Sequence, residues 1–214
     1  MAKYRFIAIF MVIAIALVNA TVVELEATRD TFVQGGVGAN NSNSASNQIV
    51  IGSGNADQTR YGYMAFSLDN LVNVNVDDIQ SATLKLHWAL YSGGATATGV
   101  LDRPGGTWNN TLTYNTQPTG FVTVANWAIN SAQTTGYNLT VDITNLVKAW
   151  KAGTVANNGF RMRYYGGNPY SYLILDSMEE VTRGLNPIIE VDYIPEPATL
   201  SILGLGGLLL RRRA

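Results

Sequence analysis

The chain has 214 residues, no cysteine, one histidine and a formal net charge of −1. The absence of cysteine excludes a disulfide framework, a thiolate nucleophile and a zinc–thiolate site, and the single His87 argues against a multi-histidine metal centre. The few Lys and Arg residues are scattered and form no basic stripe, which argues against a nucleic-acid partner.

The N-terminal residues 1–20 have the pattern of a secretory signal peptide. Lys3 and Arg5 precede an unbroken apolar run over 6–18, and small residues lead up to Ala20. This pattern predicts an N-terminal signal helix that signal peptidase removes after Ala20. The domain expected to remain, 21–194, holds nine basic and 14 acidic residues, so its net charge is −5. Such a mildly acidic chain is typical of a soluble extracellular module.

The middle of the chain is a series of short runs in which apolar and polar residues alternate. Alternation with a period of two places one face of each strand in a core and the other in water. Eight runs without regular helices between them predict an all-β fold, an antiparallel β-sandwich of the jelly-roll type. The runs cover 23–27, 64–68, 82–90, 122–124, 139–143, 160–164, 173–175 and 189–193.

One segment departs from the period of two. Ile143, Leu146, Val147 and Trp150 have the spacing of one helix face, which predicts a short helix with Trp150 in the core. Asp142 or Thr144 is expected to cap its start, and Gly153 its end. Two long connections are predicted over 34–47 and 99–120, both rich in Gly, Asn, Ser or Thr.

The C-terminal residues 195–214 have the order of a sorting signal. Pro195, Glu196 and Pro197 lead into a short apolar run, and Arg211, Arg212 and Arg213 follow it. The run is short for a permanent membrane anchor, and the arginines favour the cytoplasmic side. This segment closely resembles the PEP-CTERM signal of Gram-negative bacteria. The resemblance implies a hydrophobic sorting helix, transient insertion in the inner membrane, cleavage by an exosortase near the Pro-Glu-Pro residues, and delivery to the cell surface or extracellular matrix; a plain C-terminal anchor is the alternative.

Between the two ends, the chain resembles the DNRLRE-domain proteins. The segments that carry the resemblance are 27–33 (ATRDTFV), 60–71, 79–86 (IQSATLKL), 108–118 (WNNTLTYNTQP), 142–160 and 186–193 (NPIIEVDY). Ser67, Asn110 and Tyr114 stand where the family usually has Asp, Glu and Trp. The resemblance implies a jelly-roll β-sandwich that binds polysaccharide on secreted or surface proteins.

A binding surface is the favoured site, because sugar rings stack on aromatic planes and Arg hydrogen-bonds hydroxyls or carboxylates. Alternation around the run 160–164 points Arg163 and Tyr165 away from the core, and Tyr170 and Tyr172 follow after a glycine-rich turn. We therefore predict a ligand-binding cluster of Arg163, Tyr165, Tyr170 and Tyr172; a purely structural role for these tyrosines is the alternative. Trp108 and Trp127 are alternative residues on which a sugar ring could stack, and the family pattern favours a structural role for Trp108.

No catalytic residues or cofactor are predicted. His87 is expected on the solvated face of its strand, and Glu179 and Glu180 are neighbours whose side chains point to opposite sides, unlike the facing carboxylates of glycosidases. Calcium is a weak candidate, with Asp30, Asp57 and Asp69 as the nearest ligands.

The hypothesis that follows is a non-enzymatic exported protein that binds or embeds in exopolysaccharide, for example in a biofilm. A small polysaccharide lyase or hydrolase and a ligand-free structural matrix protein are the alternatives.

Overall fold

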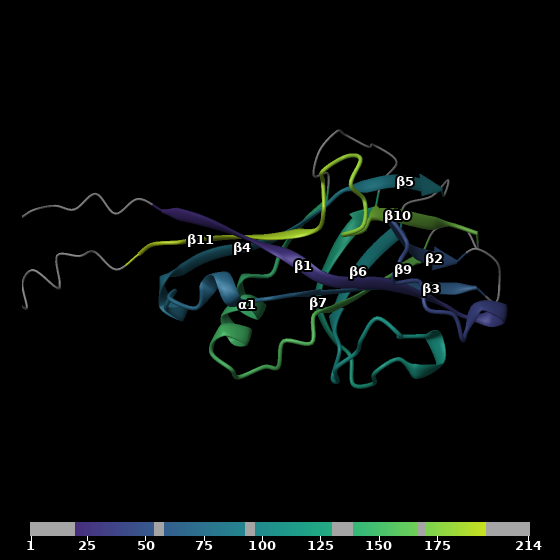
Figure 1. Cartoon of the computed structure of the whole chain (residues 1–214), viewed down its shortest axis with the longest axis horizontal. Helices are drawn as coiled ribbons and strands as arrows, with labels where there is room; N and C mark the ends of the chain where they lie inside the picture. Colours follow the sequence, from purple (N-terminus) through teal and green to yellow (C-terminus); the bar gives the residue numbers. More distant parts are fainter. Residues whose placement is uncertain (1–19, 54–57, 93–96, 130–138, 167–169, 196–214) are drawn as a thin grey trace, which may run out of the picture.

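The computed structural model describes residues 20–53, 58–92, 97–129, 139–166 and 170–195 (Figure 1). The described residues form antiparallel strands and one α-helix, which confirms the predicted all-β class. The strands are β1 (Thr21–Gln34), β2 (Gln48–Ser53), β3 (Thr59–Phe66), β4 (Ile79–Leu86), β5 (Trp88–Ser92), β6 (Ala97–Arg103), β7 (Val122–Ile129), β8 (Leu139–Asp142), β9 (Phe160–Gly166), β10 (Tyr172–Asp176) and β11 (Ile188–Tyr193), and the helix is α1 (Thr144–Lys151).

The predicted signal and sorting helices lie outside the described residues, apart from Ala20 and Pro195 at their borders. In the part of the chain that the structure describes, no helix has the length and apolar character that a membrane crossing needs.

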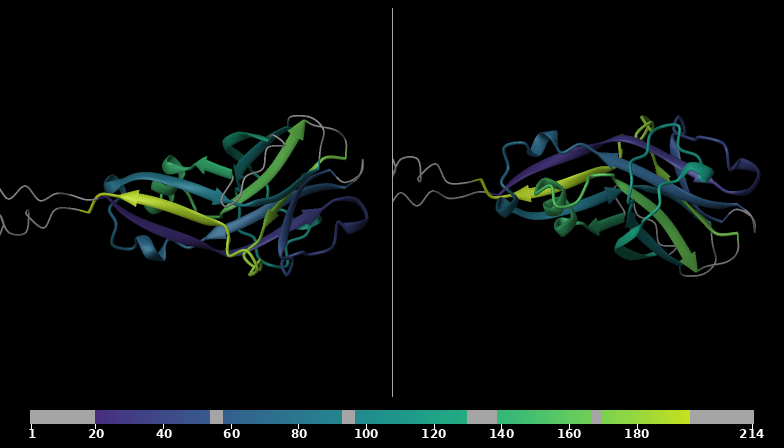
Figure 2. Two further views of the ribbon diagram at one scale, coloured as in Figure 1. Left: turned by 90° about the horizontal axis from the view of Figure 1, so that it is seen from above. Right: turned by 90° about the horizontal axis from the view of Figure 1, so that it is seen from below.

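Strand β1 belongs to two groups of strands. Its first half pairs with β11 from Thr21 to Glu26, and its second half pairs with β3 as far as Gln34, with a bulge between Ala27 and Arg29. From the first half of β1 the strand order continues β11–β4–β8. From the second half, β3 begins two paths. One path is β3–β9–β6–β7, and the other is β3–β2–β10–β5. These groups stack as a β-sandwich (Figure 2). The jelly-roll type stays a prediction.

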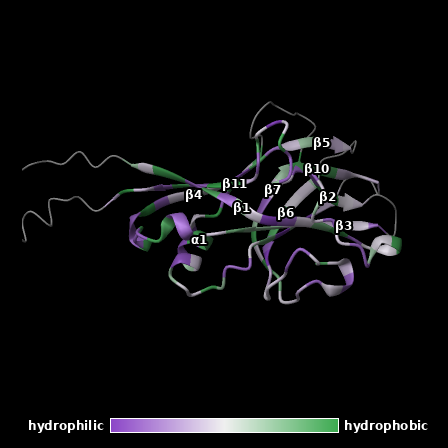
Figure 3. Ribbon diagram, in the orientation of Figure 1, coloured by the Kyte–Doolittle hydropathy of each residue, from purple (hydrophilic) through white to green (hydrophobic). Residues whose placement is uncertain are grey.

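The core lies between these groups. Ile49 and Ile51 of β2 face inward beside Leu173 and Leu175 of β10, and all four are fully buried. Phe160 of β9 packs edge-on against Phe66 and at a tilt against Trp150. Figure 3 shows hydrophobic and hydrophilic colours interspersed along the strands, as expected for strands with one buried and one exposed face.

The helix forms as predicted. Leu146, Val147 and Trp150 are buried on one face of α1. Asp142 accepts hydrogen bonds from both the backbone amide and the hydroxyl of Thr144, so it satisfies one of the free donors at the start of the helix. Gly153, with φ of +70°, follows its end.

A second, smaller core lies on the outer face of β1 and β3. Val33, Tyr63 and Ala65 point away from the main core and are covered by Trp108 and Leu112 of the connection 104–121. This connection lies on one side of β1 and β3, and the connection between β10 and β11 lies on the other (Figure 1). The Trp108 indole N–H donates to the carbonyl of Asn158 at 2.8 Å, which confirms the structural role expected for Trp108.

Two strands were not predicted. In β2, Val50 is apolar as well as Ile49 and Ile51, so the strand has no period of two. In β6 the inward position Gly99 has no side chain because the Trp127 ring occupies that space, where a Cβ would lie 1.9 Å from the ring. The predicted connection 99–120 was therefore wrong at its start: β6 runs to Arg103 and the connection begins at residue 104.

The predicted run 82–90 is divided at His87, and the solvated position expected for this residue was wrong. The chain leaves β4 and enters β5 there, so the alternation rule no longer assigns a face. The His87 side chain is only 12% exposed, and its Nδ1 lies 2.6 Å from Oδ2 of the buried Asp176.

The backbone before β9 approaches β3 so closely at Gly159 that a side chain has no room there. Gly159 has the same φ as Gly153, +70°, but its Cβ would lie 2.1 Å from the carbonyl oxygen of Met64, whereas nothing lies within 4 Å of a Cβ at Gly153. We expect Gly153→Ala to cost about 1 kcal/mol from the left-handed backbone alone. Gly159→Ala adds a backbone clash and should cost about 3 kcal/mol or more. Urea unfolding of both variants measures the difference, and equal costs would contradict the close packing of Gly159.

Candidate functional site

The outer face of β3, β9 and β6 carries the main cluster of charged and aromatic side chains. On β9, Phe160 and Met162 are fully buried, so alternation directs Arg161 and Arg163 to the opposite face. Arg161 lies between Tyr63 of β3 and Asp102 of β6 in the strand register. We define the outer-face cluster as Tyr61 of β3, Asp102 of β6, Arg161 and Arg163 of β9, and Tyr114 and Phe121 of the connection 104–121.

Asp102 is the electrostatic centre of the outer-face cluster. It is only 1% exposed, and one of its oxygens accepts from Arg161 Nη2 at 2.6 Å and from Arg163 Nε at 2.8 Å. Its other oxygen accepts from the Thr123 hydroxyl at 2.8 Å. Burial alone would raise the pKa of Asp102, but the hydrogen bonds from Arg163, Arg161 and Thr123 outweigh burial and hold the pKa below its ordinary value. Asp102 therefore fixes both arginine side chains as an ionised carboxylate.

Aromatic rings complete the cluster. Tyr61 and Tyr114 are stacked with their ring centroids 5.9 Å apart and an angle of 12° between the ring planes. The Arg161 guanidinium lies over Phe121, 3.3 Å from the ring centroid, and 5.1 Å from the centroid of Tyr61. Arg161 is 12% exposed in its side chain and Arg163 31%. Arg161 therefore serves to hold the rings in place, while Arg163 is the more accessible cation.

The structure joins two of the four predicted ligand residues. Arg163 and Tyr165 lie two residues apart on the outer face of β9, and Tyr165 is 55% exposed. Tyr172 lies on β10, where it pairs with Gly52 of β2 and with Ser92 of β5. Tyr170 is 63% exposed. β9 pairs with β3 and β6, whereas β10 pairs with β2 and β5, so Tyr165 and Tyr172 lie on strands that do not pair with each other. The ligand role of all four residues stays a prediction.

Sequence reasoning missed Tyr61, Asp102, Tyr114 and Phe121. Asp102 was hidden in a segment expected to be a connection, and the predicted run 64–68 began after Tyr61. Tyr114 stood out as a departure from the DNRLRE pattern, which was the available signal. That this residue stacks on Tyr61, 53 residues earlier in the chain, follows only from the path of the connection 104–121.

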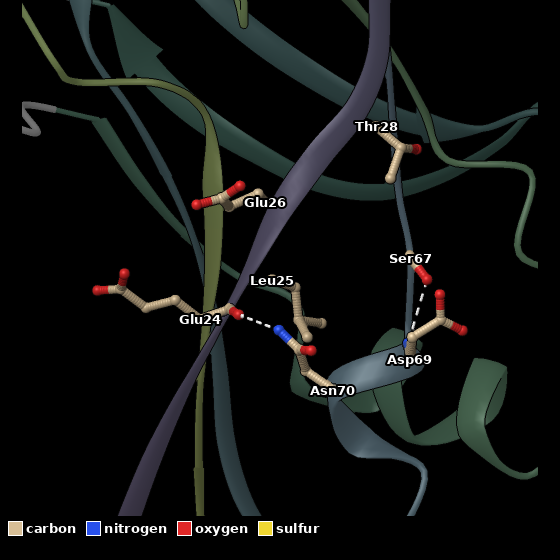
Figure 4. Close-up of a pocket in the computed structure, with 7 residues that line it drawn as sticks. All are labelled: Glu24, Leu25, Glu26, Thr28, Ser67, Asp69 and Asn70. Carbon is tan, nitrogen blue, oxygen red and sulfur yellow. Dashed lines mark hydrogen bonds between the residues drawn. The ribbon is translucent and has the colours of Figure 1, made fainter.

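A shallow hollow of about 220 Å³ lies elsewhere, beside the β1 bulge (Figure 4). Its lining includes the carboxylates of Glu24, Glu26 and Asp69, and the Asn70 amide donates to the carbonyl of Glu24 at 3.1 Å. No aromatic ring lines this hollow. It lacks a stacking plane for a sugar ring and its charge would repel an acidic polymer, so it is a weaker candidate than the outer face.

The predicted calcium candidates lie in different surroundings. Asp30 is buried, Asp69 lies beside the hollow, and Asp57 lies outside the described residues. Burial raises the pKa of Asp30 to about 8, the Met178 amide lowers it, and the nearby charge of Glu179 raises it further. No group of three or more His, Asp or Glu side chains suited to a metal occurs in the described ranges.

A comparison with family models identifies carbohydrate-binding module family 96 over residues 21–183. The matched range begins at the first residue of β1 and contains β1 to β10, so it includes every residue of the outer-face cluster. No curated protein matches the chain significantly. The family match supports the carbohydrate-binding β domain expected from the sequence, and it is consistent with an extracellular or cell-surface protein. The DNRLRE resemblance and the sorting signal stay predictions.

Asp102→Asn should loosen the outer-face cluster. The substitution leaves Arg161 and Arg163 without a counter-charge, and we expect a loss of about 2–4 kcal/mol in the free energy of unfolding. Because the pKa of Asp102 is lowered on folding, its stabilisation is complete above the unfolded pKa near 4 and is lost as the pH falls through the lower folded pKa. Urea unfolding from about pH 2 to 7 should therefore give curves for the two proteins that converge at the acid end. A constant difference across this range would contradict the ionised role of Asp102.

Proposed function

Because the chain belongs to carbohydrate-binding module family 96, we propose that its β-sandwich binds polysaccharide through the outer-face cluster and the neighbouring Tyr165. The observation that carries this proposal is the fixed group of rings and guanidinium groups around Asp102. Tyr165 offers an exposed ring, and Arg163 offers N–H groups beside it.

The geometry suits a sugar polymer. Aromatic rings stack on the C–H faces of sugars, and guanidinium groups donate to hydroxyls or carboxylates. The Tyr61–Tyr114 stack and the Asp102 ion pairs hold their side chains before a ligand arrives, which reduces the entropy lost on binding. Each site would bind a single sugar weakly, so many copies along one polymer would provide the useful avidity.

We further propose that the chain is exported and left at the surface or in the exopolysaccharide matrix of a Gram-negative bacterium. The signal segment 1–20 and the sorting segment 195–214 support this location. Thr21 and Tyr193 pair with each other, so both predicted processing sites lie at one end of the domain, whereas the outer-face cluster lies beside the other half of β1. A tail held by the membrane would leave the proposed binding face open to polymer.

Two other functions differ from this proposal in what they would produce. A lyase or hydrolase would create new sugar ends, and a structural matrix protein would neither cleave nor saturably bind a polymer. The neighbouring Glu179 and Glu180 do not favour hydrolysis, because Glu180 is buried and accepts from the Thr182 amide, whereas Glu179 is exposed.

The binding proposal is tested with the purified protein and a panel of acidic and neutral bacterial and algal polysaccharides. We expect saturable binding without new sugar ends, measured by isothermal titration calorimetry and a reducing-end assay in the same samples. Tyr165→Ala should weaken binding about tenfold, or about 1.4 kcal/mol, because it removes a stacking plane. Arg163→Ala should weaken binding of the same polymer.

The controls locate the site. Glu24→Gln, in the acidic hollow, should bind like the unchanged protein. If Tyr170→Ala or Tyr172→Ala weakens binding and Tyr165→Ala does not, the site lies near β10 instead. New sugar ends would establish an enzyme, and a panel without saturable binding would favour the structural role.

The sorting proposal predicts a change in location. In a Gram-negative host that carries an exosortase, replacing Arg211, Arg212 and Arg213 with Ala should prevent retention for processing, and replacing Pro195, Glu196 and Pro197 with Ala should leave the tail uncut. Cell fractionation and mass measurement of the C-terminus provide the readouts. Identical location and C-terminus in a host without exosortase would contradict this proposal.

A further inference from the structure

The outer face of the sheet continues beyond the outer-face cluster, over β6 and onto β7 (Figure 1). On β6, Ala97 and Leu101 are buried in the main core. On β7, Trp127 and Ile129 are buried in the same core. Side chains alternate between the two faces along a strand, so the residues between these point outward. The outward residues are Thr98 and Val100 of β6, and Asn126 and Ala128 of β7.

One row of outward residues is accessible along its length. Tyr165 of β9 pairs with Thr98, and Thr98 pairs in turn with Ala128. Tyr165 is 55% exposed, Ala128 is exposed and Thr98 is partly exposed. Neighbouring strands lie about 4.8 Å apart, so this row extends about 10 Å from β9 to β7. Because Thr98 and Ala128 have small side chains, they leave room beside the Tyr165 ring for a second sugar of the same polymer.

The neighbouring row carries a polar group at each end. Arg163 pairs with Val100, and Val100 pairs with Asn126. Val100 is only 1% exposed, whereas Asn126 is exposed and Arg163 is partly exposed. The Asn126 amide both donates and accepts hydrogen bonds, which suits a sugar hydroxyl. Since β7 contains no charged residue, a cation lies at one end of this row and a neutral amide at the other.

We propose that a polysaccharide crosses β9, β6 and β7 on this face, and that Asn126 binds the sugar next to the one stacked on Tyr165. The proposal rests on the binding role proposed above for Tyr165 and Arg163. It adds the substrate class, which is a run of linked sugars in an extended polymer with a hydroxyl group that faces Asn126. A single sugar would contact Tyr165 and Arg163 alone.

The test uses the purified full chain and the polysaccharide of the panel above that it binds most tightly. This polysaccharide is titrated intact, as its tetrasaccharide and as its monosaccharide. Asn126→Ala should weaken binding of the polymer and the tetrasaccharide about threefold to tenfold, which is the loss expected for one hydrogen bond. The weak binding of the monosaccharide, followed by NMR chemical shifts, should stay unchanged because a single sugar does not reach Asn126.

Asn73→Ala is the matched control. Asn73 is an exposed asparagine in the connection between β3 and β4, away from the strands that the polymer would cross. This variant should bind like the unchanged protein. The melting temperatures of both variants should equal that of the unchanged protein, because both side chains are exposed.

The outcomes separate this inference from the proposed function. If Tyr165→Ala weakens binding and Asn126→Ala does not, the polymer does not reach β7 and the inference is overturned, while the proposed function stands. An equal loss for the monosaccharide and the polymer, or an equal loss in Asn73→Ala, would also overturn it. If no polysaccharide of the panel binds, or neither Tyr165→Ala nor Asn126→Ala weakens binding, the proposed site is wrong and the inference fails with it.

Discussion

The arrangement of the molecule depends on the bulge that lets one strand, β1, serve two groups of strands. Before the bulge, Leu25 points inward and the strand pairs with β11; after it, the strand pairs with β3. In a β-strand a shift of one residue exchanges the two faces, so the register set between Ala27 and Arg29 decides what each face carries. It turns Asp30 toward the turn after β10, and it turns Thr31 and Val33 toward the connection 104–121.

The outer face consequently combines a packed base with an accessible surface. Trp108 and Leu112 cover Val33 and Tyr63, and the Arg29 guanidinium lies 4.8 Å from the centroid of the Trp108 ring. Tyr63 adds a polar tie, because its hydroxyl donates to Gln117 at 2.7 Å. A long connection would otherwise lose its order to chain entropy, and these contacts offset that loss. The rings that it presents beside Arg163 are therefore held by buried contacts and not by a ligand.

Sequence patterns predicted most of this fold because periodicity reports burial directly. The runs that became β4, β8, β9 and β11 alternate cleanly, and the helix face of Leu146, Val147 and Trp150 is buried as expected. The pattern failed at residues that are buried by side chains from distant parts of the sequence. Gly99 appears unsuited to a strand until the Trp127 ring is seen to fill its place, and His87 lies where the chain passes between strands.

The candidate site was harder to predict for the same reason. Alternation alone directed Arg163 and Tyr165 outward, since both face away from Phe160 and Met162. It had no means of bringing Tyr114 or Phe121 to the same surface, because a connection without periodicity has no predictable path. Asp102 is the clearest case: in the sequence it is one acidic residue among 15 Asp and Glu, and only the pairing of β6 with β9 places it beneath two arginines.

The same strand also separates two opposite electrostatic environments. On the outer side of β1 and β3, two guanidinium groups share one buried carboxylate, so the local charge is positive in a domain whose net charge is −5. On the inner side, Asp30 lies near Glu179 without a basic partner among the described residues. A surplus of N–H donors is suited to sugar hydroxyls and carboxylates. Because β1 is common to both sides, the register set at its bulge determines both environments.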